Sequence, residues 1–182
     1  MNRPLQTKRR LWFSSPLGGW SLASTEAALI SLDWQGSTLT APAGFREDPE
    51  TDLERHALAL LQRYFVGEIV TFDALPLQLT GTPFQQAVCH ALAGIPYGET
   101  RSYQWMAHRV DRPRATRAVG GALGRNPLPI ILPCHRVITS AGGLGGFMSG
   151  RGADALDLKA GLLALEGSTG AAVGPLALFN KG

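Results

Sequence analysis

The segment PCHRV at residues 133–137 places one of the two cysteines of the chain beside a histidine and an arginine. A thiol attacks as its thiolate, and a neighbouring histidine or cation is what makes a thiol reactive at neutral pH. The apolar run at residues 130–132 indicates a short buried segment that delivers Cys134 to a fixed place. The alternative is that Cys134 is a small packing residue and His135 a structural histidine. The pair alone does not decide between these interpretations.

Most of the positive charge lies in one part of the chain. The formal net charge is +3, but residues 101–151 carry eight arginines against a single acidic residue, Asp111. A local excess of arginine is typical of a surface that meets phosphate, and the guanidinium group suits bidentate phosphate contacts. A solvated basic face is the alternative. The overlap with the cysteine segment favours a nucleic-acid partner.

Length and periodicity indicate an α+β protein. The chain has 182 residues and 45% hydrophobic content, enough for one ample core or two small ones. Apolar runs at residues 11–40, broken at Gly18-Gly19 and Gln35-Gly36, predict an antiparallel sheet with tight turns. Residues 52–66 have apolar positions at helical spacing. We expect a small α/β domain at residues 1–79, a mainly helical domain at 80–167 and a tail at 168–182.

The second domain begins with helical patterns. Thr82-Pro83 is a cap and first-turn proline, and Cys89 borders the apolar face that follows, where we expect it to pack. Residues 102–109 and 115–123 predict two short helices joined by a tight break, a helix-turn-helix candidate. Gly120 and Gly121 cost the second helix about 1 kcal/mol each, so something favours their small size. Close approach to a DNA groove would do so, and so would a neighbouring helix.

Several separated motifs in this part of the chain resemble those of the O6-alkylguanine-DNA alkyltransferases. The resemblance runs from about Thr82 to Gly167, and the amino-terminal part is only weakly similar. The motifs are GTPFQ at 81–85, IPYGET at 95–100, RAVGGA at 117–122, NPLPIILPCHRVI at 126–138 and LLALEG at 162–167. Because they occur in the right order, they are far more specific than one cysteine-histidine pair.

The resemblance implies a ribonuclease H-like first domain and a winged-helix-like second domain that binds damaged duplex DNA. In this family the second helix of the helix-turn-helix lies in the minor groove, and an arginine, here Arg117, fills the space of an extruded nucleotide. Extrusion is needed because a thiolate cannot reach an atom inside stacked, paired duplex. The DNA-contacting residues implied in this way are Arg117, Ala118, Gly120, Gly121, Arg125 and Arg136.

The resemblance also implies the reaction, a transfer of the alkyl group from guanine O6, and also from thymine O4, to Cys134. His135 would take the thiol proton through a bridging water, and Glu166 would orient the imidazole. Tyr103 would hydrogen-bond or protonate N3 of the leaving base, and Asn126 would brace the turn before the cysteine. The thioether formed at Cys134 would not react further, so each chain would transfer one alkyl group only.

For Arg136 and for the connection after Gly146, the resemblance leaves more than one interpretation. Arg136 is expected to give structural or electrostatic support as well, with a plain salt bridge as the alternative. The connection between Gly146 and Lys159 is several residues longer than we expect in the family. It normally supplies a pocket wall, here Phe147, Met148 and Ser149. A longer wall that tolerates larger alkyl groups is a hypothesis.

The sequence offers no metal or cofactor site of recognisable spacing. The four histidines and two cysteines are scattered, so we expect neither zinc nor another cofactor. Without a long apolar stretch or a signal-type segment, we expect a cytoplasmic monomer, with possible cooperativity on DNA. A cysteine hydrolase remains a rival function, although no oxyanion hole is evident. A non-catalytic lesion sensor is another, but such relatives lack the cysteine.

Overall fold

The computed structural model describes residues 8–148 and 152–168, and its contacts divide the chain into two compact units, Met1–Leu79 and Thr80–Gly182. Ser149, which we expected in the pocket wall, lies outside the described residues. The same holds for the tail expected at 168–182, apart from Ser168. No helix in the described ranges is both long enough and apolar enough to cross a membrane.

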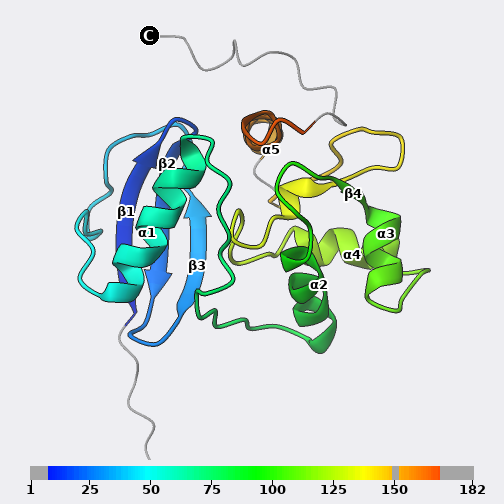
Figure 1. The fold of residues 1–182 in the computed structure, drawn as a ribbon, viewed down its shortest axis with the longest axis horizontal. Helices are drawn as coiled ribbons and strands as arrows, with labels where there is room; N and C mark the ends of the chain where they lie inside the picture. The colour runs from blue at the N-terminus through cyan, green and yellow to red at the C-terminus, as the bar shows by residue number, and fades with distance from the viewer. Residues whose placement is uncertain (1–7, 149–151, 169–182) are drawn as a thin grey trace, which may run out of the picture. The chain divides into compact units, whose positions relative to one another are not determined.

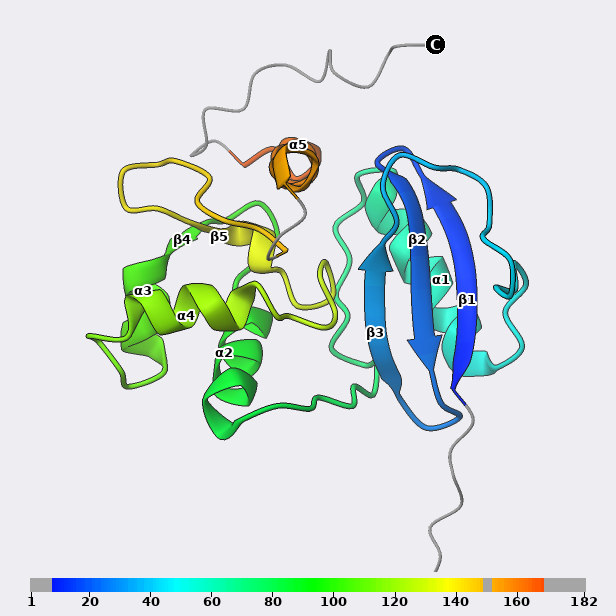
Figure 2. The same ribbon diagram turned by 180° about the vertical axis from the view of Figure 1, so that it is seen from behind.

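The first unit is an antiparallel sheet with one helix against it. The strands β1 (Arg9–Ser15), β2 (Gly18–Ser24) and β3 (Leu29–Trp34) follow one another in space as in sequence. Helix α1 (Asp52–Phe65) covers one face of this sheet, as the two opposite views show (Figures 1 and 2). The predicted sheet and helix are both present, and α1 ends one residue earlier than the periodicity indicates.

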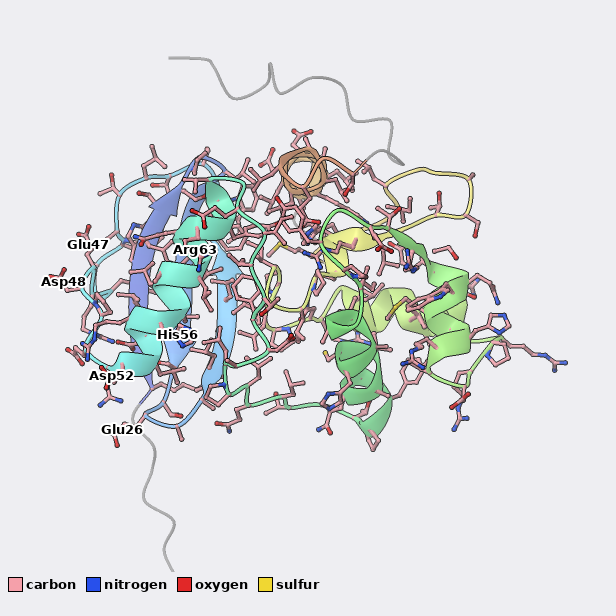
Figure 3. The ribbon with its side chains drawn as sticks, viewed as in Figure 1. Glu26, Glu47, Asp48, Asp52, His56 and Arg63 are labelled. Atoms are coloured by element: carbon pink, nitrogen blue, oxygen red, sulfur yellow. The ribbon has the colours of Figure 1, made fainter. Side chains whose placement is uncertain are left out.

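An aromatic core joins the sheet to α1. Trp20 on β2 is fully buried, and its ring lies 5.7 Å from that of Phe65 at the end of the helix. The opposite side of α1 carries exposed charged and polar side chains, including Asp52, His56 and Arg63 (Figure 3). This division between an apolar and a polar face is the physical basis of the helical periodicity in the sequence.

One predicted turn has a different role. Gln35-Gly36 ends β3 and does not connect two long strands, because residues 37–50 form a loop. An isolated bridge between Leu11 and Arg46 and a ring contact between Trp12 and Phe45 tie this loop to the sheet. Gly36 still needs its positive φ of 82°, a conformation that glycine adopts without strain.

Helices make up most of the second unit. They are α2 (Pro83–Ala93), α3 (Tyr103–Arg109), α4 (Thr116–Leu123) and α5 (Gly152–Leu165). The first of them begins with a capping box, in which Thr82 and Gln85 exchange side-chain and backbone hydrogen bonds. Helix α4 packs against both α2 and α3. The predicted helices in residues 82–123 are therefore confirmed, with ends shifted by about one residue.

A short parallel pair of strands brings the cysteine segment to the start of α3. Strand β4 (Arg101–Ser102) pairs with β5 (Val137–Ile138), so that Arg101 is opposite Val137. The single 3-10 turn Cys134–Arg136 directly precedes β5, and Tyr103 directly follows β4. Two segments that lie more than 30 residues apart in sequence are thus held side by side.

Candidate active site

The chain before the cysteine is locked into a buried turn. The Asn126 side-chain amide donates to the carbonyl oxygen of Leu132 at 2.7 Å, and its oxygen accepts from the Leu128 N–H at 3.1 Å. Inside this turn Ile130 has φ 74°, a strained conformation for a β-branched residue that costs about 1–3 kcal/mol. The hydrogen bonds of Asn126 and the burial of the turn stabilise the folded segment and offset the cost of this conformation. Asn126 is placed to set the position of Cys134.

The thiol of Cys134 is buried, with 4% of the residue exposed. Burial raises its pKa to about 11, although a hydrogen bond from Asn126 and the charge of Lys159 both lower it. At pH 7 only about one molecule in 10⁴ would then hold a thiolate. The resting residue is a protonated thiol, so any reaction of its sulfur needs a base.

A histidine and a carboxylate form a buried pair in the same unit. Nε2 of His135 lies 2.7 Å from Oε1 of Glu166, and both side chains are fully excluded from solvent. Burial lowers the pKa of His135 below its ordinary value, which outweighs the opposite effect of Glu166. Burial alone would raise the pKa of Glu166, but contacts with His135 and Arg136 hold it well below its usual range. At neutral pH the pair is a neutral imidazole beside a carboxylate.

Arg136 belongs to the same buried cluster. Its guanidinium donates to both oxygens of Glu166, at 2.9 and 3.0 Å, and to the carbonyl oxygen of Ile95 at 2.5 Å. Only 9% of the side chain is exposed. The expected DNA contact by Arg136 therefore disagrees with the structure, because the guanidinium faces Glu166 and not solvent. The alternative of a supporting ion pair describes this residue.

Tyr103 lines a hollow of about 480 Å³ between α3, α4 and the glycine-rich loop at residues 141–146. Its hydroxyl donates to the carbonyl oxygen of Gly146 at 3.1 Å, and burial raises its pKa. The Cys134 thiolate would raise that pKa further, which links the tyrosine electrostatically to the sulfur. The lining residues are Tyr103, Thr116, Arg117, Gly120, Gly124, Gly145, Gly146 and Phe147.

Helix α4 presents its one basic residue, Arg117, to solvent. Arg117 and Ala118 are exposed, and Arg117 lines both the hollow at Tyr103 and a second one of about 610 Å³. The second hollow also contains Arg114 and Arg125 together with the start of α2. The basic residues of this surface all come from the segment in and around α4.

The two glycines of α4 are not required by packing against a neighbouring helix. A Cβ on Gly120 would lie 3.7 Å from the ring of Tyr103, and one on Gly121 would lie 3.4 Å from the Arg125 guanidinium. Both distances are ordinary van der Waals contacts. Their small size instead leaves space at the two hollows, which agrees better with close approach by a ligand.

Lys159 was not singled out from the sequence. Its side chain is fully buried, and its ammonium donates to the carbonyl oxygens of Val137 at 2.6 Å, Gly146 at 3.3 Å and Leu144. Burial lowers its pKa to about 8. A lysine on the leucine-rich face of α5, one residue after Leu158, is the signal that could have identified it. It ties the strand after the cysteine segment to the glycine-rich loop.

The structure thus brings Cys134, His135, Glu166, Asn126 and Tyr103 into one unit, with Arg117 and Arg125 on its exposed face. Within residues 8–148 and 152–168, no group of three or more His, Cys, Asp or Glu side chains is arranged to hold a metal ion. The chemistry available is that of a thiol, a neutral base and a hollow beside a basic helix.

Comparisons with known proteins point to one family. Residues 83–168 match the 6-O-methylguanine DNA methyltransferase DNA binding domain, and residues 9–79 match the ribonuclease-like domain of the same family. The methylated-DNA–protein-cysteine methyltransferases of Methanosarcina acetivorans and Methanosarcina barkeri are 44% and 46% identical to this chain. These matches cover 86% and 84% of this chain and 96% and 92% of the relatives.

Solved structures agree. The Mycobacterium tuberculosis O6-methylguanine methyltransferase is 39% identical, with a TM-score of 0.75 over 96% of this chain and 100% of that one. A complex of the M. tuberculosis protein with DNA has a TM-score of 0.72 at 39% identity, over 94% of this chain and 98% of that one. Together, the matches along both units show that the chain belongs to the 6-O-methylguanine DNA methyltransferase family.

Proposed function

We propose that this protein repairs O6-alkylguanine in duplex DNA by moving the alkyl group to Sγ of its own Cys134. One observation carries the proposal: a buried thiol and the His135–Glu166 pair share a unit with a hollow beside a basic helix. Two of the M. tuberculosis structures support it, because their descriptions name O6-methylguanine methyltransferase activity and a complex with DNA.

The reaction is an in-line displacement. A bond forms between the sulfur and the alkyl carbon, the bond from that carbon to O6 breaks, and its electron pair stays on the guanine. The thiol proton passes to His135 through a bridging water, since a thiol whose pKa is about 11 is protonated before it reacts. Tyr103 hydrogen-bonds or protonates N3 of the leaving base, and the proton gained by His135 balances the negative charge left on the guanine. The thioether product is stable to water, so the protein acts once.

Recognition rests on α3 and α4, which act as a helix-turn-helix motif with α4 in the minor groove. The damaged base rotates into the hollow of about 480 Å³ at Tyr103, because the sulfur cannot reach it inside the duplex. Arg117, exposed at the mouth of that hollow, fills the space left in the base stack. Ala118, Gly120, Gly121 and Arg125 contact the DNA backbone and groove. O4-alkylthymine is a second substrate.

The organisation proposed with this function is a ribonuclease H-like domain at residues 1–79 and a winged-helix-like transfer domain at 80–167. The protein binds DNA as a monomer, with possible cooperativity between neighbouring copies. Several like-charged arginines on one face support an ionic, salt-dependent contribution to binding.

Intact-protein mass after incubation with a duplex containing O6-methylguanine tests the proposal. We expect a gain of one methyl group, located on Cys134 by peptide mapping. Cys134→Ala should gain none and still bind the duplex, whereas the matched variant Cys89→Ala should be methylated like the wild type. Unchanged mass despite tight lesion binding would indicate a sensor. Turnover of an ester substrate would indicate a hydrolase.

A further inference from the structure

We propose that Arg136 is a positioning residue for the histidine base: it holds Glu166 as a partly neutralised anion, and thereby keeps His135 uncharged with its hydrogen on Nε2. The inference rests on the function proposed above, in which His135 receives the proton of the Cys134 thiol. It assigns a chemical task to an arginine whose guanidinium is buried against Glu166.

The first argument is the set of donors around the carboxylate. Oε1 of Glu166 accepts from Arg136 Nη2 at 3.0 Å and lies 2.7 Å from His135 Nε2. Oε2 accepts from Arg136 Nε at 2.9 Å and from the Gly98 N–H at 3.2 Å. A carboxylate in such surroundings is ionised, and an ionised carboxylate can only accept hydrogen bonds.

The tautomer of His135 follows from this. Because Glu166 only accepts, Nε2 of the imidazole has to carry the hydrogen that joins them. In a neutral imidazole the lone pair is then on Nδ1. A proton leaving the thiol of Cys134 must go to Nδ1.

The second argument concerns charge. A buried carboxylate 2.7 Å from an imidazole would on its own stabilise the imidazolium, which has no lone pair left to accept a proton. Burial opposes the imidazolium most strongly. Among the charged groups that act on His135, Glu166 favours the imidazolium, whereas Arg136 and Lys159 both oppose it. Arg136 shares the oxygen that faces the ring, so it is the cation best placed to offset Glu166.

The third argument is that Arg136 is anchored. The remaining guanidinium nitrogen of Arg136 donates to the carbonyl oxygen of Ile95 at 2.5 Å. The guanidinium carbon Cζ lies 5.7 Å from the ring centre of Tyr97. Tyr97 in turn donates to the carbonyl oxygen of Leu165, the residue before Glu166. A planar guanidinium anchored in this way can donate to both carboxylate oxygens at once, which the single ammonium group of a lysine does not do with the same geometry.

The experiment is a pH titration of ¹⁵N-labelled histidine by NMR, with the His135 signals assigned by their loss in His135→Gln. In the wild type we expect the Nε2–H tautomer and a neutral ring at pH 7. In Arg136→Met the titration midpoint should rise by about one unit, a tenfold change in the protonation equilibrium. Arg136→Lys, which keeps the charge but loses the fork, should lie between the two.

A matched control is Arg63→Met. Arg63, on α1 of the first unit (Figure 3), also pairs with a glutamate. It lies 2.7 Å from Glu68, but both side chains are about half exposed. This variant should leave the His135 midpoint unchanged. The single-turnover rate with free O6-benzylguanine should shift to higher pH in the Arg136 variants in parallel with the midpoint.

An unchanged midpoint in a folded Arg136→Met or Arg136→Lys protein would show that the arginine is only structural. If neither variant folds, the wild type still decides, because an Nδ1–H tautomer or a charged ring at pH 7 would overturn the inference. The titration needs no alkyl transfer. A Cys134 that gains no methyl group would therefore refute the proposed function without affecting the reading of His135.

Discussion

The ammonium of Lys159 lies 2.6 Å from the carbonyl oxygen of Val137 and so joins α5 to the strand that follows the cysteine segment. The same nitrogen is 5.9 Å from the ring centre of Tyr103, which lines the proposed base pocket. A single buried cation thus connects the thiol side of the site with the wall of the hollow. It also lowers the pKa of the Cys134 thiol.

Lys159→Met should therefore slow the reaction and destabilise the protein. Loss of the hydrogen bonds from a charged donor should lower the free energy of unfolding by about 1–3 kcal/mol, and loss of the charge should raise the pKa of Cys134. Urea unfolding and the pH dependence of the reaction with O6-benzylguanine measure the two effects. Lys8→Met, at an exposed position, is the control. An identical pH profile in Lys159→Met would rule out an electrostatic contribution.

Arg117→Ala should separate base extrusion from chemistry. Without the side chain that fills the stack, repair of an O6-methylguanine duplex should slow by about 10–100-fold at saturating DNA, since unstacking costs a few kcal/mol. The reaction with free O6-benzylguanine should be unchanged. Arg109→Ala removes an exposed arginine that lines neither hollow, and it should affect only the salt dependence of binding. Equal losses on both substrates would contradict the role given to Arg117.

Gly145→Ala should damage the wall of the hollow. A Cβ at this glycine would come 2.7 Å from the hydroxyl oxygen of Tyr103, and the φ of 66° costs an alanine about 1–2 kcal/mol. We expect lower stability and slower transfer of benzyl than of methyl, because Tyr103 must move. Gly146→Ala is a close control, since nothing lies within 4 Å of its Cβ position. Similar behaviour of the two variants would argue against this wall.

Acid should weaken the protein through its buried base system. The pKa of folded His135 is below its ordinary 6.5, so the unfolded state binds more protons and the free energy of unfolding falls below about pH 6.5. The lowered pKa of Glu166 adds a further fall below its ordinary 4.5. Urea unfolding between pH 7 and 4 measures this. In His135→Gln the free energy of unfolding should no longer depend on pH above about pH 5. If it falls there as in the wild type, a group other than His135 causes the fall.

The local features of this chain follow from its sequence. The Thr82–Gln85 capping box, the Ser102 cap and the apolar spacing of residues 52–65 act within one or two turns, so α1, α2 and α3 could be predicted, whereas α5 was not. The cysteine segment and its neighbouring motifs likewise sufficed to predict the family. In contrast, neither predicted glycine turn is a hairpin turn: Gly18 and Gly19 open β2 after a turn at Pro16-Leu17, and Gln35-Gly36 leads from β3 into a loop.

The tertiary structure decided how the charged residues pair. His135 and Glu166 are 31 residues apart, and Arg136 reaches a carbonyl group 41 residues away, so neither partner is encoded in local spacing. The β4–β5 pairing and the packing of α5 bring these groups together and exclude water from them. Burial then determines their protonation, because desolvation is a property of the folded unit and not of a motif. For the same reason Arg136, which lies in the arginine-rich part of the sequence, was expected to contact DNA, whereas the folded protein buries it against Glu166.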